Sequence, residues 1–137
     1  MGTALVTGAT SGIGEEFCWQ LAAAGHDLVL VARREDALRA LAGSLTNVAG
    51  VRAEVIAADL STDAGCARVA ARLDVGGPAD RDKSDLAPVD LLVNNAGFGL
   101  GSAFLDNSLE NEINGLNVMV RAVMTLAHHA GISMRSR

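Results

Sequence analysis

Apolar and polar positions follow one another along this chain in a pattern that predicts strands separated by helices. Three short apolar runs predict strands at about 3–7, 27–32 and 89–93, and an alternating stretch predicts a fourth at about 52–57. Between these runs, apolar residues recur at helical spacing in three segments, at about 12–24, 33–45 and 62–73. This alternation predicts right-handed crossover connections, and therefore an α/β fold built on a parallel sheet.

The last part of the chain predicts helices of a less regular kind. Asp106 is expected to cap a helix over about 108–114, and Gly115 to interrupt it. A long apolar helix is predicted over 117–129. The apolar pattern then stops, so residues 131–137 are expected to be a tail unlike the native continuation of such a domain.

The turn between the first strand and the first helix is rich in glycine, with the sequence Gly8-Ala9-Thr10-Ser11-Gly12-Ile13-Gly14. Gly8 permits backbone angles that a Cβ forbids, while Gly12 and Gly14 leave room for a pyrophosphate and for close helix–strand contact. The unpaired N–H groups and the positive dipole end of the following helix then face an anion. This glycine turn (residues 8–14) is therefore a candidate phosphate cradle, and on this stretch alone a tight turn without a ligand is the alternative.

Composition and charge narrow the classes of function. The 137 residues suffice for a single domain over 1–137, half of them are hydrophobic, and a net charge of −5 argues against a nucleic-acid surface. Because no apolar run reaches membrane-spanning length and no leader opens the chain, we expect a cytoplasmic protein without a membrane partner. No third ligand at metal spacing accompanies the histidines, so no metal site is expected.

The glycine turn also predicts the topology of the sheet. A phosphate-binding turn after the first strand of a doubly wound parallel sheet is typical of the strand order 3-2-1-4. The ligand crevice is then expected at the carboxyl ends of strands one and four, on either side of the point where the chain changes direction. Asn94-Asn95-Ala96-Gly97 follows strand four at this edge.

Four separate stretches together resemble one protein family. Thr7 to Gly14, Asp59-Leu60, Asn94-Asn95-Ala96-Gly97 and Asn117 fall in the order and spacing of the classical branch of the short-chain dehydrogenase/reductase family. The resemblance covers Met1 to about Ala130. It implies a Rossmann-type doubly wound parallel sheet and an oxidoreductase that moves a hydride between a nicotinamide cofactor and an alcohol or ketone.

The resemblance also implies roles for individual residues. Asp59 would accept a hydrogen bond from the adenine amino group, and Asn117 would be the family's catalytic asparagine, which holds a water in a proton relay. The residues that would bind the cofactor are Gly8, Thr10, Ser11, Gly12, Ile13, Gly14, Arg33, Arg34, Asp59, Leu60, Asn94, Asn95, Ala96 and Gly97. Without the resemblance, Asn117 is an ordinary polar residue on a helix face, and Asn94-Asn95 is a turn that satisfies backbone groups at the end of a sheet.

Two arginines at the end of the second strand indicate which cofactor is bound. Folds that select NAD usually place a carboxylate there for the ribose 2′-hydroxyl, whereas this chain has Arg33 and Arg34. A guanidinium at this place suits a 2′-phosphate, and it is otherwise mildly unfavourable at a helix start because of the helix dipole. We therefore expect NADP as the cofactor rather than NAD.

The sequence departs from the family in the residues that carry its chemistry. Family members use a Tyr-x-x-x-Lys pair and a serine, but this chain has no tyrosine, and its one lysine, Lys83, lies in a polar stretch at 76–85 that is expected to be a surface loop. Its length is about half of the family's usual length. We therefore expect a truncated fold that is inactive alone, and the alternative is a catalytically silent nucleotide-binding or subunit-interaction module.

A truncated fold of this kind would leave two surfaces without cover. Strand four would have an unpaired outer edge, and the helix over 117–129 would have a bare apolar face. Apolar surfaces of this size are rarely left in water. We therefore expect the chain to form a homo-oligomer through these two surfaces.

Overall fold

The computed structural model describes residues 1–81 and 85–137. Within these residues, a four-stranded parallel sheet has the order β3-β2-β1-β4, with the strands β1 (Thr3–Thr7), β2 (Asp27–Ala32), β3 (Ala53–Ala57) and β4 (Val89–Val93). The predicted order 3-2-1-4 is therefore confirmed. Lys83 lies outside the described residues, as does the middle of the loop expected at 76–85.

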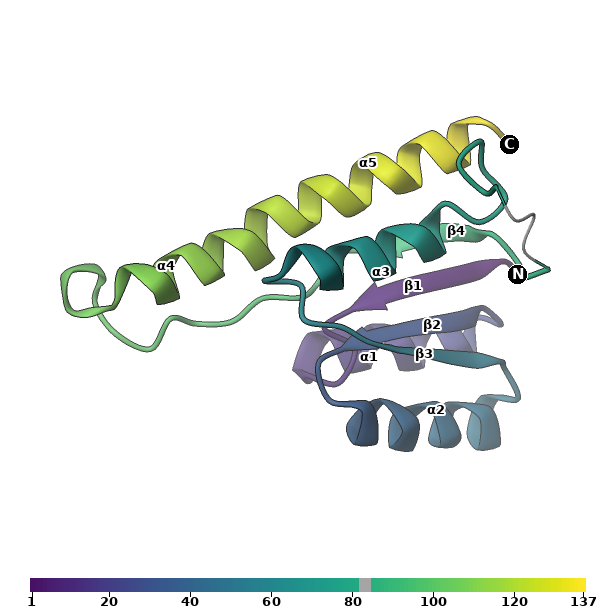
Figure 1. Ribbon diagram of the computed structural model, residues 1–137. Coiled ribbons are helices and arrows are strands. Elements are labelled where there is room, and N and C mark those ends of the chain that lie inside the picture. The colour runs from purple at the N-terminus through teal and green to yellow at the C-terminus, as the bar shows by residue number, and fades with distance from the viewer. Residues whose placement is uncertain (82–84) are drawn as a thin grey trace.

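Helices cover both faces of the sheet, as Figure 1 shows. On one face lie α1 (Gly12–Ala23) and α2 (Glu35–Ala49), and on the other lie α3 (Asp63–Leu73) and α5 (Ala122–Arg135). Successive residues of a strand point to opposite faces, so Leu28 and Leu30 join the core under α2, while Val29 joins the core under α3 and α5. The fold is thus a doubly wound α/β sheet with one apolar core on each side.

Local sequence explains where α3 begins and where α2 ends. Thr62 is the N-cap of α3, and its side-chain hydroxyl accepts a hydrogen bond from the Gly65 N–H at 3.0 Å. Gly50 ends α2 in the left-handed region, with φ of 71°. α2 continues past Gly43 because Leu41 and Leu45 are buried on its inner face, and this burial outweighs the roughly 1 kcal/mol that a glycine costs a helix.

The C-terminal helices correct the sequence prediction at three points. After a short 3-10 turn, η1 (Phe104–Asp106), the N-cap of α4 (Leu109–Leu116) is Ser108 and not Asp106. Gly115 does not interrupt the helix, because its lack of a Cβ admits the side chain of Leu100, which would lie 2.9 Å from that Cβ. A π-helical segment, η2 (Asn117–Arg121), then joins α4 to α5 in one continuous rod (Figure 1).

The rod does not end at His129 as predicted, because residues 131–135 continue α5. Ser133 is buried, and its hydroxyl donates to the Val75 carbonyl at 3.3 Å. Arg137 donates to the Val89 carbonyl at 2.7 Å, which ties the end of the chain to β4. The non-native character expected of 131–137 stays a prediction. No helix among the described residues is both long and apolar enough to cross a bilayer.

Candidate functional site

The glycine turn leaves the first turn of α1 without a side-chain cap. The backbone enters the turn at Gly8 with φ of 66° and leaves it at Gly12 with φ of 25°. Ser11 is the N-cap residue of α1, but its hydroxyl donates back to the Gly8 carbonyl at 3.1 Å and does not accept from the helix. The N–H groups at this helix start therefore have no side-chain acceptor, as an anion site requires.

Gly14 is the point of closest approach between α1 and the turn. A Cβ at Gly14 would lie 2.0 Å from the Gly8 carbonyl oxygen and 2.4 Å from Nδ2 of Asn95. Neither a backbone oxygen nor the amide next to it can yield by that much. A Cβ at Gly12 would meet no atom within 4 Å, so the requirement for glycine there is one of backbone conformation alone.

Thr7 and Asn95 join the glycine turn to the end of β4. The Thr7 hydroxyl accepts hydrogen bonds from the N–H groups of Asn95 and Ala96, both at 3.0 Å. The Asn95 side chain in turn donates to the Gly8 carbonyl at 3.3 Å. The Thr7 hydroxyl also donates to the Val93 carbonyl at 3.4 Å. The two segments that were expected to meet at the carboxyl edge of the sheet are therefore fixed to each other by four hydrogen bonds.

A cleft of about 540 Å³ opens at this edge. It is lined by nine residues that the sequence predicted, namely Gly8, Thr10, Ser11, Arg33, Arg34, Asp59, Leu60, Ala96 and Gly97. They come from the carboxyl ends of all four strands. The cleft has the size of a small-molecule site, and it lies at the predicted place in the sheet.

Charged side chains at the cleft have polar or charged partners. Arg34 forms an ion pair with Asp36 at 3.0 Å, and both side chains are about three-quarters exposed. Hydrogen bonds from the Ser61 hydroxyl and N–H to the Asp59 carboxylate hold the pKa of that carboxyl below its usual value, and the charge of Arg33 lowers it further. The cleft therefore presents a carboxylate acceptor at Asp59 and, next to it, guanidinium donors.

Six of the predicted residues do not line the cleft. Gly12, Ile13 and Gly14 belong to the start of α1, where the Ile13 side chain is exposed. Asn95 lies beneath the turn, as described above. The Asn94 side chain donates to the Val123 carbonyl at 3.5 Å, and that of Asn117 donates to the Ser61 carbonyl at 3.4 Å. Both of these amides therefore point towards other backbone segments.

The C-terminal rod and the loop before it supply four lining residues that sequence reasoning missed, Phe98, Asn111, Asn114 and Val118. The last three recur at helical spacing, so they lie on one face of the rod. This spacing could have predicted a shared helix face. It could not have predicted that this face lines the cleft, because that depends on the path of the chain from Gly97 back to α4. Among the described residues, no group of three or more His, Cys, Asp or Glu side chains is placed to hold a metal ion.

Comparison with known proteins gives one consistent result. A family model described as short chain dehydrogenase matches residues 2–137. A short chain dehydrogenase of Pseudocercospora fijiensis is 31% identical over 129 residues, which are 91% of this chain and 38% of that protein.

Two solved structures are similar in both sequence and fold. A short-chain dehydrogenase from Sphingobium yanoikuyae in complex with NADPH is 35% identical with a TM-score of 0.84, and the match covers 95% of this chain and 47% of that one. A bulky-bulky ketone specific alcohol dehydrogenase from Comamonas testosteroni is 33% identical with a TM-score of 0.84, over 95% of this chain and 48% of that one. The chain thus spans about half the length of the solved structures that it matches.

Proposed function

The chain belongs to the short chain dehydrogenase family, and we propose that its cleft binds NADP as the cofactor-binding half of an enzyme that interconverts an alcohol and a ketone. One observation carries this proposal. The cleft brings the glycine turn up to Ser11, the N-cap residue of α1, together with two arginines and the Asp59 carboxylate, to one edge of the sheet. The NADPH bound by the Sphingobium yanoikuyae relative and the ketone specificity of the Comamonas testosteroni relative support it.

The residues of the cleft fit the parts of a dinucleotide phosphate. The glycine turn would hold the pyrophosphate with its backbone N–H groups, since a Cβ at Gly8 would come within 2.9 Å of Ala96 and narrow the approach. Arg33 and Arg34 would hold the 2′-phosphate. Asp59 would accept a hydrogen bond from the adenine amino group, and the Leu60 backbone would touch the ring. Ala96 and Gly97 would lie towards the ribose and the nicotinamide.

The chemistry proposed for the whole enzyme needs more than this half provides. When bound, NADPH supplies the hydride, but reduction of a ketone also needs a proton donor near the carbonyl oxygen. The chain has no tyrosine, and the Asn117 amide is not an acid. Such a proton donor is typically worth about 10²–10⁴-fold in rate. We therefore propose that the 137-residue chain binds cofactor but does not turn over substrate by itself.

A second function is supported by the apolar surface of the C-terminal region. Leu105 is 90% exposed and Leu116 is 61% exposed, while the outer edge of β4 has no strand beside it in the described part of the chain. These features support a catalytically silent module that binds nucleotide and associates with other subunits. We propose that association is between copies of this chain, through the sheet edge and the rod.

Calorimetry with NADPH and NADH tests the cofactor proposal. We expect NADPH to bind more tightly, and Arg33→Asp to remove that preference, because loss of a charge-assisted contact with phosphate costs about 1.5–3 kcal/mol, or about tenfold to a hundredfold. Arg39→Asp is the matched control, since Arg39 pairs with Glu35 on α2 and does not line the cleft. Equal affinities of the unaltered chain for NADPH and NADH would contradict the proposal that Arg33 and Arg34 hold the 2′-phosphate.

A turnover assay tests whether the chain by itself is an enzyme. With NADPH and a panel of ketones and aldehydes, we expect oxidation of the cofactor at the background rate only. Steady turnover that disappears in Asn117→Ala would show that the chain is an enzyme by itself and contains a proton donor or water relay of its own. Binding without turnover would agree with both proposals, because neither expects the isolated chain to turn over substrate.

A further inference from the structure

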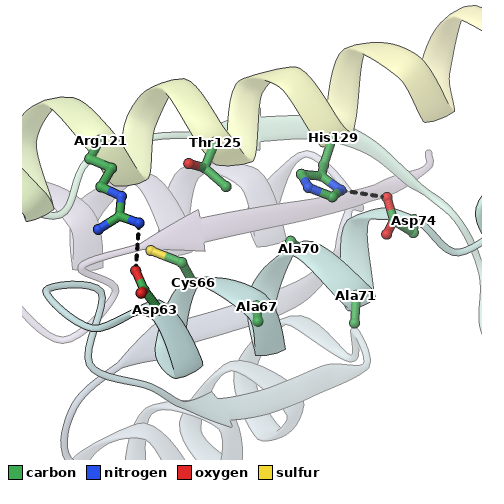
Figure 2. A pocket seen from close by; sticks show the side chains of 9 residues that line it. All are labelled: Asp63, Cys66, Ala67, Ala70, Ala71, Asp74, Arg121, Thr125 and His129. Carbon is green, nitrogen blue, oxygen red and sulfur yellow. Dashed lines mark hydrogen bonds and ion pairs between the residues drawn. The ribbon is translucent and has the colours of Figure 1, made fainter.

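Two side chains of the C-terminal rod contact the segment that carries Asp59. The Asn117 amide donates to the Ser61 carbonyl at 3.4 Å, and the Arg121 guanidinium forms an ion pair with Asp63 at 2.6 Å. Figure 2 shows the second contact, where Arg121, the last residue of η2, reaches across a groove between α3 and α5 to Asp63 at the start of α3. Asn117 and Arg121 are the first and last residues of the π-helical segment. Such segments are frequent at functional sites.

Residues 58–62 form a short loop between β3 and α3, which Asn117 contacts at Ser61, and Arg121 contacts Asp63 directly after this loop. Inside this β3–α3 loop, the Asp59 carboxylate accepts from the Ser61 N–H at 3.0 Å and from the Ser61 hydroxyl at 2.7 Å. Ser61 therefore orients the carboxylate through two donors, while its carbonyl is bound from outside by Asn117. A change at Asn117 can reach Asp59 through a single intervening residue.

Two further hydrogen bonds hold the β3–α3 loop on the side of α3. The Cys66 thiol donates to the Leu60 carbonyl at 3.4 Å, and the Thr62 hydroxyl donates to the Asp59 carbonyl at 2.8 Å. These contacts come from the loop itself and from α3. Asn117 and Arg121, by contrast, come from a part of the chain more than 50 residues away along the sequence, so they connect the loop to the rod whose Asn114 and Val118 line the far side of the cleft.

We propose that Asn117 and Arg121 are positioning residues for the nucleotide end of the cleft. They hold the β3–α3 loop against the rod and so keep the Asp59 carboxylate turned to the adenine side of the bound cofactor. This role differs from the proton relay that the resemblance implies for Asn117, because it acts on cofactor affinity and does not require substrate. It rests on the proposed function only for the identity of the ligand.

Hydrogen exchange of the ligand-free chain tests the positioning directly. In Asn117→Ala and in Arg121→Ala, we expect the amides of Ser61 and Thr62, which bond to Asp59, to exchange about threefold to tenfold faster, as loss of one hydrogen bond predicts. Amides of α1 should be unchanged. Thr125→Ala is the matched control, because Thr125 lines the same groove one turn further along α5 (Figure 2) and should leave the loop unaffected. Unchanged exchange in the loop, or equal acceleration in α1, would overturn the proposal.

Binding of 2′,5′-ADP tests the consequence for the ligand. We expect Asn117→Ala to weaken its binding about threefold to tenfold, and to weaken it no further when Asp59→Asn is already present. Arg121→Lys should retain most of the affinity that Arg121→Ala loses. An undiminished effect of Asn117→Ala beside Asp59→Asn would refute action through Asp59. If the unaltered chain does not bind 2′,5′-ADP, the proposed function fails, and the exchange experiment still decides whether the loop is held.

Discussion

Strands β2 and β4 have similar apolar sequences but very different surroundings. β2 lies between β1 and β3, and the four residues from Leu28 to Val31 are buried. β4 pairs with β1 on one side, and its sequence Val-Asp-Leu-Leu-Val leaves Leu91 37% exposed. An apolar run thus specifies a strand that needs burial, and it does not specify which segment will bury it.

The helices differ in the same way between the two regions. α2 buries Leu38, Leu41 and Leu45 against the sheet. On α4, Leu109 is 73% exposed and Leu116 is 61% exposed, although the apolar spacing is equally helical. In the region from β1 to α3 (the closed region) the core-facing apolar side chains are buried, in part against α5, whereas the region from β4 to α5 (the open region) still exposes an apolar face.

The largest effect is expected from Gly14→Ala in the closed region. Its Cβ would lie 2.0 Å from the Gly8 carbonyl oxygen, so α1 must move away from the turn. We expect the free energy of unfolding in urea to fall by about 1–3 kcal/mol or more, together with loss of NADPH binding. The control is Gly43→Ala on α2, which has open space for a Cβ and should gain about 0.5–1 kcal/mol. A Gly14→Ala chain of normal stability would mean that the close approach at this turn is not tight.

The next effect concerns association of the open region. Dilute, freshly purified chain should show concentration-dependent association by light scattering, and Leu116→Glu should weaken it about tenfold or more, since a buried leucine contributes about 1.5–3 kcal/mol. Val48→Glu is the control, because Val48 is 76% exposed on α2 in the closed region. Compact monomer at all concentrations would show that the open region does not self-associate. Equal effects of the two substitutions would remove the distinction between the regions.

The comparison also explains how far sequence could predict this structure. The strands, the strand order and the glycine turn follow from short-range pattern, and each strand was placed within about one residue. The continuous rod did not follow, because the missing Cβ at Gly115 leaves room for the Leu100 side chain, and 131–135 stay helical with Ser133 bonded to Val75. Both reasons are tertiary contacts between segments distant along the sequence.

The residues of the candidate site also fall into a group that the sequence predicts and a group that depends on tertiary contacts. Gly8, Arg33 and Asp59 directly follow strands, so their convergence at one sheet edge was predictable from topology. Phe98 and Asn114 were missed because their place depends on the long return of the chain after β4. Asn117 was predicted as the family's catalytic asparagine, and the path of the rod turns its side-chain amide to the Ser61 carbonyl. The sequence pattern therefore predicted where the cleft lies, whereas the path of the rod determines which other side chains line it.

The smallest expected effect is a difference in reactivity between the two cysteine thiols. Cys18 lies in the closed core, where burial raises the pKa of its thiol to about 12, and Cys66 faces the groove between α3 and α5, where burial raises its pKa as well. At pH 8.5, iodoacetamide should label Cys66 first and Cys18 only upon unfolding, which mass spectrometry can measure.

The raised pKa of Cys18 also predicts a weak dependence of stability on pH. Below the ordinary thiol value of 9.0 the thiol is protonated in both states, so its contribution is fully present. As pH rises towards about 12, the unfolded chain ionises this thiol while the native core keeps it neutral, so the free energy of unfolding falls. Cys18→Ala should therefore flatten the alkaline decline more than Cys66→Ala does. An equal slope for both variants would mean that the core around Cys18 opens as readily as the groove, and the contrast between the closed and open regions would not extend to α1.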